Sequence, residues 1–160
     1  MTTATFSLQG GDPISDKLNA MLDNVRGTGL QSYLATTVFK QYQQFQLARW
    51  QSAGSGDSSV TTSEGDRWEA LNKKYLKRKR KKYATFDYGG NQMLVAKGDL
   101  LKSVIGPGNG QQILTTQTGM TITTTLYYAK FVSKLRYFES LGESSMGEIR
   151  QGIMDYVMGG

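Results

Sequence analysis

The sequence predicts an α+β fold, in which an N-terminal strand and helices pack on an antiparallel β meander and a C-terminal helix completes the domain. Two observations lead to this prediction. Apolar residues recur at helical spacing in the first third of the chain and again near its end. Between these regions, apolar residues and threonines alternate in short segments that are separated by glycine-rich turns.

The N-terminal part is expected to form a short strand and then two helices. Residues 2–8 are rich in β-branched side chains, which favours a strand. Asp12 and Pro13 suit a helix start, because the carboxylate accepts from orphan amides and proline at the first helical position loses no needed donor. Gly27 is placed to end this helix. Its apolar face consists of Ile14, Leu18, Met21, Leu22 and Val25. A longer helix is expected over 30–52, with an apolar stripe of Leu30, Tyr33, Leu34, Val38, Phe39, Tyr42 and Phe45.

Two flexible insertions are expected within one domain that spans 1–160. Residues 53–66 are a polar tract of glycine and serine with almost nothing to bury, and 84–92 is rich in turn residues. Between them, 67–83 is predicted to be a helix. The residues expected to point inward are Trp68, Leu71, Tyr75 and Leu76, with basic residues on the remaining faces.

The C-terminal half is expected to hold a three-stranded meander and a last helix. Residues 93–105 contain a turn at Lys97 and Gly98 and continue as an apolar strand or as a short helix that leads to one. Residues 111–117 and 120–126 flank a Thr-Gly turn and predict a hairpin with one dry and one wet face. The pattern of 127–138 is mixed, and 146–157 has apolar residues at helical spacing.

Composition limits the chemistry that this chain can perform. The 160 residues suffice for one domain with a core of its own. The sequence has no cysteine and no histidine, which excludes disulfides and thiolate chemistry and removes the commonest general base. No run of about 18 apolar residues is present, and the first ten residues lack the features of a signal peptide. We therefore expect no membrane contact and synthesis in the cytoplasm.

The positive charge is concentrated in one segment. The chain carries a formal charge of +6, and residues 73–82 hold eight of the 19 basic residues and no acid. The rest of the chain therefore carries −2, six minus eight. Any partner attracted by the positive charge therefore contacts this one segment. The eight basic residues are Lys73, Lys74, Lys77, Arg78, Lys79, Arg80, Lys81 and Lys82.

Three interpretations of this basic segment stay open. It contacts the phosphates of DNA, docks on an acidic neighbouring protein, or is a solvated helix face. Tyr75 and Tyr83 interleave with the charges, which suits stacking on bases, although Tyr75 is favoured as a core anchor. Because exposed charges contribute little to stability, changing 77–80 to serine is expected to leave folding intact.

Other candidate sites are better explained by structure than by chemistry. Large aromatic residues dominate burial in cores and interfaces, so we interpret Trp68, Tyr128 and Phe138 in that way rather than as a ligand pocket. The glycines of 106–110 indicate a turn, since no phosphate-binding motif surrounds them. A metal-dependent nuclease would have to use scattered acids, namely Asp87, Asp99 and Glu139. We therefore expect no catalysis, no cofactor and no metal.

Several short motifs in order resemble the phage virion-morphogenesis family, also called tail-completion proteins. The first lies in GDRWEAL, the second in LVAKGDLLKSV, the third in YYAKF and the fourth in RYF. The matching residues are Gly65, Trp68, Leu71, Leu94, Gly98, Leu100, Ser103, Val104, Tyr128, Ala129, Arg136 and Phe138. The chain departs from the family at 130–133, where a histidine-glutamine-glycine loop is common, and at Tyr137, which replaces a proline.

The resemblance implies a structural, non-enzymatic virion protein of a tailed bacteriophage, a tail-completion or neck subunit at the head–tail junction. It implies a ring of roughly six or twelve copies that contacts connector, adaptor or tail-tube proteins, with DNA as a further partner in the channel. The protein would reside in the host cytoplasm during assembly. A tail-terminator ring protein and a free nucleic-acid-binding module without sequence preference stay open as alternatives. The expected core or interface anchors are Trp68, Leu71, Tyr128, Arg136 and Phe138.

Overall fold

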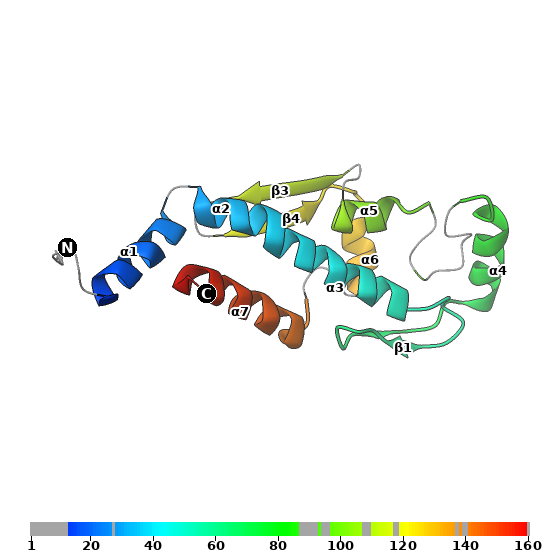
Figure 1. The fold of residues 1–160 in the computed structure, drawn as a ribbon. Coiled ribbons are helices and arrows are strands. Elements are labelled where there is room, and N and C mark those ends of the chain that lie inside the picture. The colour runs from blue at the N-terminus through cyan, green and yellow to red at the C-terminus, as the bar shows by residue number, and fades with distance from the viewer. Residues whose placement is uncertain are drawn as a thin grey trace.

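The computed structural model describes residues 13–26, 28–86, 93, 97–106, 110–116, 119–136, 138 and 141–159. It combines helices with short antiparallel strands, which confirms the α+β class (Figure 1). The strand expected at 2–8 lies outside the described residues, as do the expected helix-terminal residues Asp12 and Gly27. The first described helix, α1, spans Pro13–Val25 as expected.

The helix expected over 30–52 is present as three consecutive segments: α2 (Gly29–Tyr33), the π-helical η1 (Leu34–Val38) and α3 (Phe39–Ser52). The joining residues keep right-handed helical dihedrals, so the chain continues as one helix. Residues four apart drift around an α-helix of 3.6 residues per turn, and the wider π turn offsets part of that drift. The inward stripe therefore repeats every four residues, as Leu30, Leu34, Val38, Tyr42, Gln46 and Trp50.

The tract 53–66 contributes to the core. It leads from α3 into an antiparallel hairpin of β1 (Val60–Thr61) and β2 (Arg67–Trp68). Ala53 is fully buried and Thr62 is 4% exposed. The expectation that this tract has almost nothing to bury is therefore wrong. Small side chains let the backbone pass close to α3, and a glycine-rich composition conceals that packing from a hydropathy pattern.

The basic helix begins later than the sequence predicts. α4 spans Lys73–Lys82, and the Oδ1 of Asn72 caps it by accepting from the backbone N–H of Lys74 at 3.0 Å. Trp68 was expected on this helix and instead lies on β2, where it pairs with Val60. Strand pairing and full burial of the indole ring decide its position, because both depend on residues that are distant in sequence.

The C-terminal half forms a helix and one hairpin. α5 (Asp99–Ile105) confirms the short-helix alternative for this region. β3 (Gln111–Thr115) and β4 (Met120–Thr124) pair antiparallel, with Ile113 opposite Ile122. Along β4, half-buried and exposed residues alternate as predicted. Within the described residues, the expected three-stranded meander is thus a two-stranded hairpin.

Two further helices complete the chain. α6 (Ala129–Leu135) follows the hairpin, in the segment where the sequence pattern was mixed. α7 (Glu143–Met158) confirms the predicted last helix, and its Ile149 is buried. No helix in the described part of the chain is both long enough and apolar enough to cross a bilayer.

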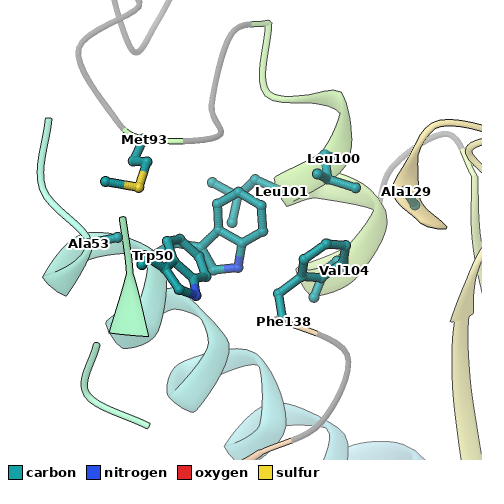
Figure 2. Packing of buried hydrophobic residues seen from close by; sticks show 9 residues of the cluster. Trp50, Ala53, Met93, Leu100, Leu101, Val104, Ala129 and Phe138 are labelled. Carbon is teal, nitrogen blue, oxygen red and sulfur yellow. The ribbon is translucent and has the colours of Figure 1, made fainter. Parts of the chain in front are cut away.

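The core consists of two clusters. In the first, the ring of Trp50 meets Trp68 at 5.8 Å and Phe138 at 5.9 Å between centroids, both edge-on (Figure 2). Its other buried members are Ala53, Met93, Leu100, Leu101, Val104 and Ala129. The second cluster consists of Leu30, Leu34, Val38, Leu141 and Ile149. Tyr42 packs against both clusters and so joins them.

The molecule is elongated, with α1 at one end and α4 at the other (Figure 1). The long α2–η1–α3 helix runs between these ends. The β3–β4 hairpin lies along one side of this helix, and α7 lies along another (Figure 1).

Candidate functional site

The basic segment forms the whole of α4, at one end of the molecule (Figure 1). Lysine and arginine are good helix formers, and those in the last turn lie where the helix dipole favours positive charge. Six of the eight cations are exposed: Lys73, Lys74, Lys77, Arg78, Lys81 and Lys82. The segment thus presents a dense positive surface, as the sequence suggested.

Lys79 and Arg80 differ from the other six cations. Lys79 is only 3% exposed, because it follows Leu76 by one helical turn on the inward side. Burial, with a smaller contribution from the charge of Arg80, lowers the pKa of Lys79 to about 8. Arg80 Nη2 lies 2.6 Å from Asp57 Oδ2. The expectation that every basic residue occupies an outward face is therefore wrong for Lys79.

Aromatic rings lie among these cations. Tyr75 is 43% exposed, so its expected role as an inward core anchor is wrong, and Leu76, which is 5% exposed, takes that position. The guanidinium of Arg78 lies 5.9 Å from the centre of the Tyr75 ring. The ammonium of Lys82 lies 5.4 Å from the centre of the Tyr83 ring. The exposed face of α4 is therefore both cationic and aromatic.

A cleft of about 480 Å³ lies between α4, α5 and α6, and we call it the α4 cleft. Tyrosines and charged residues line it: Tyr75, Lys79, Tyr83, Lys97, Asp99, Tyr127 and Tyr128. Tyr127 is 81% exposed, and its ring meets that of Tyr128 edge-on, with centroids 5.4 Å apart. Burial, followed by the negative charge of Asp99, raises the pKa of Tyr128. Each wall of the cleft thus offers an aromatic or a charged group.

The predicted anchors lie in or beside the first core cluster. Trp68 and Phe138 are 0% and 1% exposed, and both contact Trp50. Leu71 and Tyr128 are half-buried and pack against this cluster. Arg136 donates from Nη2 to the backbone oxygen of Glu69 at 2.7 Å. An additional role for these residues in a subunit interface stays a prediction.

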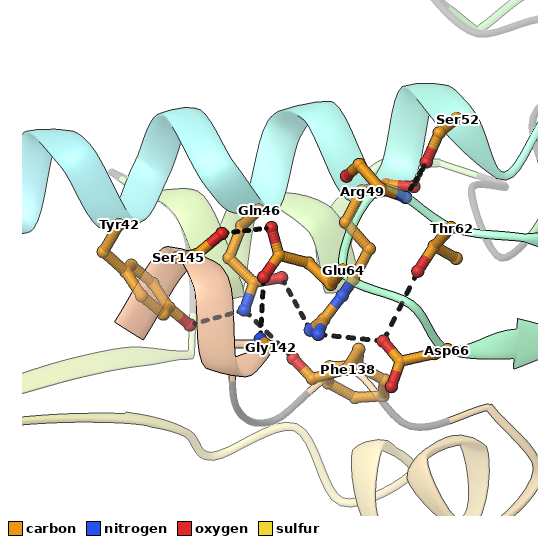
Figure 3. A network of polar contacts seen from close by, with 11 residues as sticks. Tyr42, Gln46, Arg49, Ser52, Thr62, Glu64, Asp66, Phe138, Gly142 and Ser145 are labelled. Atoms are coloured by element: carbon orange, nitrogen blue, oxygen red, sulfur yellow. Dashed lines mark hydrogen bonds and ion pairs between the residues drawn. The ribbon is translucent and has the colours of Figure 1, made fainter. Parts of the chain in front are cut away.

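A buried polar network on α3 was not found from the sequence (Figure 3). Arg49 is 1% exposed and its Nη2 lies 2.8 Å from Asp66 Oδ2. Gln46 is fully buried and donates from Nε2 to the backbone oxygen of Phe138 at 3.2 Å. The four-residue spacing of Gln46 between Tyr42 and Trp50 was the available signal. Asp66 gives no signal, because it stands in a polar tract.

Glu64 joins the same tract to α7 (Figure 3). Its carboxylate accepts from the backbone N–H of Gly142 at 2.7 Å and from the hydroxyl of Ser145 at 2.9 Å. A carboxylate at a helix N-terminus satisfies orphan donors and complements the helix dipole. These polar contacts therefore hold the hairpin, α3 and the start of α7 together, which is a structural role.

The acids considered for catalysis are only partly described. Asp99 is exposed in the first turn of α5 and lines the α4 cleft. Asp87 and Glu139 lie outside the described residues. In the part of the chain that the structure describes, no three or more acidic residues gather into a group that could hold a metal ion.

The opposite end of the molecule is formed by α1 (Figure 1), which carries a second, apolar surface. Leu18, Leu22 and Val25 are 41%, 43% and 39% exposed, and we call them the α1 stripe. Their spacing places them on one side of α1. The helix is held to α7, where Asn24 donates from Nδ2 to the backbone oxygen of Tyr156 at 3.0 Å. The α1 stripe thus stays in contact with solvent.

Comparison of this chain with protein-family models, with curated proteins and with solved structures found no match. The assignment of a function therefore depends on the sequence motifs and on the two surfaces described above.

Proposed function

We propose that this chain is a non-enzymatic structural subunit of a tailed-phage particle, a tail-completion or neck protein that acts as a ring of identical copies. The ordered motifs that resemble the tail-completion family support the phage assignment. The positions of the α1 stripe and of α4, at opposite ends of an elongated subunit, support two separate contacts (Figure 1).

The exposed α1 stripe is the observation that supports the proposal of a ring. A monomer would keep three apolar side chains about two-fifths exposed in water. Full burial of an exposed leucine or valine contributes roughly 1.5–3 kcal/mol, so covering the remaining two-fifths of each side chain contributes about 1 kcal/mol. A neighbouring copy that covers the stripe therefore gains stability. A head-to-tail contact repeated by rotation closes into a ring, in which every copy covers one stripe.

The basic helix then repeats around the ring. Six exposed cations in each copy form a positive collar that faces the DNA path or an acidic neighbouring ring. Contacts between such cations and phosphates are salt-sensitive and indifferent to base sequence. This suits a protein that surrounds DNA without reading it.

The oligomeric state of the purified chain tests the proposal. We expect analytical ultracentrifugation to show a closed oligomer for the wild-type protein. Leu22→Asn should produce folded monomers, because it places an amide in the covered stripe. Leu47→Asn is the matched control, since Leu47 is 38% exposed on α3, away from the stripe. Circular dichroism verifies that both variants fold.

Two results would overturn the ring. One is a monomeric wild-type chain, and the other is equal assembly of the Leu22 and Leu47 variants. A monomer that binds DNA tightly at low salt would favour the free nucleic-acid-binding module. Electron cryo-microscopy of the assembled particle, with the subunit placed at the neck or at the end of the tail, distinguishes a neck protein from a tail terminator.

A further inference from the structure

We propose that the α4 cleft binds an unpaired base of single-stranded nucleic acid, while the exposed cations of α4 hold the adjoining phosphates. This inference rests on the contact between α4 and a polyanion in the proposed function, and it specifies the chemical form of that partner. It requires two neighbouring subsites, one for a base and one for phosphate.

The cleft has the size and lining of a base subsite. Its volume of about 480 Å³ falls within the roughly 300–1,000 Å³ of small-molecule sites. Tyr127 lines it and is 81% exposed, so its ring has a face open for stacking. Tyr75 and Tyr83 line the same cleft from α4. Aromatic rings bind bases of any sequence, because every base has a π face.

The charges in the cleft favour a base over a phosphate. Lys79 and Lys97 line it together with Asp99, which is an acid. A carboxylate repels a phosphate, whereas it accepts hydrogen bonds from the amino and imino groups of bases. The exposed Lys97 can donate to base carbonyl groups. The mixed charge therefore places the base inside the cleft and the phosphate outside it.

The phosphate subsite adjoins the base subsite. A second hollow of about 330 Å³ lies over α4 and carries Arg78 and Lys82. Tyr75, Lys79 and Tyr83 line both hollows, so the two are contiguous. The second hollow has no acid among its lining residues. A strand whose base enters the α4 cleft would therefore pass its phosphates over Arg78 and Lys82.

Other polyanions fit this arrangement less well. In a duplex the bases are paired and stacked, so their faces cannot reach Tyr127. An acidic peptide would use the cations of α4, but it would leave the open tyrosine rings without a partner and would be repelled by Asp99. Single-stranded nucleic acid uses all three features.

Fluorescence anisotropy with the full-length protein tests the base subsite. The probes are a labelled oligothymidine of about 20 nucleotides and a duplex of similar length, each at about 50 and 200 mM salt. Tyr127→Ala removes the stacking ring, and Tyr127→Phe is the matched control that keeps it. Lys82→Gln removes one cation from the phosphate subsite. Circular dichroism verifies the fold of each variant.

We expect the wild-type protein to prefer the single strand. Tyr127→Ala should weaken its binding about 5- to 150-fold, which is the stacking range of roughly 1–3 kcal/mol at about 1.4 kcal/mol per tenfold. Duplex affinity and the salt dependence should not change, and Tyr127→Phe should retain wild-type binding. Lys82→Gln should weaken both probes and lower the single-strand salt slope by about 0.7.

The base subsite is rejected if Tyr127→Ala weakens both probes equally, or weakens neither. It is also rejected if rings form and neither probe binds at low salt. That result would support the ring and would favour an acidic protein as the partner of α4. The opposite combination, a monomer whose single-strand binding depends on Tyr127, supports the base subsite and overturns the ring.

Discussion

Burial changes how a basic residue affects the stability of the fold, as Lys79 on α4 shows. Its ordinary pKa of 10.5 is lowered to about 8, mainly because burial disfavours the charged ammonium. Between these two pH values the folded chain has released a proton that the unfolded chain still binds. The free energy of unfolding therefore rises with pH across this window. Below about pH 8, the buried charge destabilises the fold.

A Lys79→Met variant should remove this pH dependence. We expect the free energy of unfolding of the wild-type chain to rise from about pH 8 to 10 relative to that of the variant. Urea denaturation at several pH values measures the difference. Lys77→Met, at an exposed position on the same helix, is the control and should follow the wild type. Identical pH profiles for wild type and Lys79→Met would contradict the lowered pKa.

Tyr75 and Leu76 show that the position of a residue around a helix decides its role. The sequence placed Tyr75 inward on a helix that was expected to begin at residue 67. The Asn72 cap starts the helix at Lys73 instead, and the inward side then passes through Leu76 and Lys79. The ring of Tyr75 therefore lies on the exposed face of α4 and not in the core.

At the scale of elements, α4 carries buried or paired charges on one side and solvent-facing charges on the others. Arg80 is paired with Asp57 and Lys79 is buried, so neither belongs with the solvent-facing set. The replacement of 77–80 that the sequence suggested would therefore disturb packing as well as charge. A cleaner set of exposed cations is Lys77, Arg78, Lys81 and Lys82.

Replacing these four exposed cations with glutamine should preserve the fold and weaken nucleic-acid binding. Glutamine keeps the helix propensity, and exposed charges contribute little, so the free energy of unfolding should change by less than about 1 kcal/mol. The slope of log affinity for duplex DNA against log salt should fall by up to about 3.6, at roughly 0.9 per lost phosphate contact. Denaturation and anisotropy measure the two effects. A variant that does not fold would show that these charges are structural.

The hairpin of β1 and β2 is an element that exists only through its contacts. Each of its strands is only two residues long, so the hairpin is too short to be stable by itself. Leu71 donates its backbone N–H to the oxygen of Gly56 at 2.8 Å, and Trp68 buries its ring against Trp50. The same tract supplies Asp57, Glu64 and Asp66 to three different partners.

At the scale of the whole molecule, the Arg49–Asp66 ion pair connects the long helix to this hairpin (Figure 3). Removing one partner of a buried pair leaves the other charge uncompensated and typically costs about 3–5 kcal/mol. Asp66 is 21% exposed, so we expect Arg49→Met to lower the free energy of unfolding by about 2–4 kcal/mol.

Urea denaturation with a matched pair tests this link. Arg67→Met breaks the ion pair between Arg67 and Glu69, whose side chains are 73% and 67% exposed. It should lower the free energy of unfolding by less than about 1 kcal/mol. If Arg49→Met is as mild as Arg67→Met, the buried pair does not hold the hairpin to α3.

The long helix and the last helix were predictable from the sequence because their signal is local. The apolar repeat of 30–52 and that of 146–157 each lie within one segment, and backbone hydrogen bonding joins residues only four apart. The hairpin at 111–124 was predictable for a similar reason, since alternation flanks a short turn. The basic segment and its charge were evident without any structure.

The sequence alone therefore determined the α+β class, the long helix, the last helix and the concentration of positive charge. Only the tertiary structure decided that Lys79 is buried, that Trp68 lies on a strand, and that Tyr127 meets α4 across a cleft. These facts depend on contacts between segments far apart in the chain. Burial and ion pairing are properties of such contacts, and no periodicity within one segment records them.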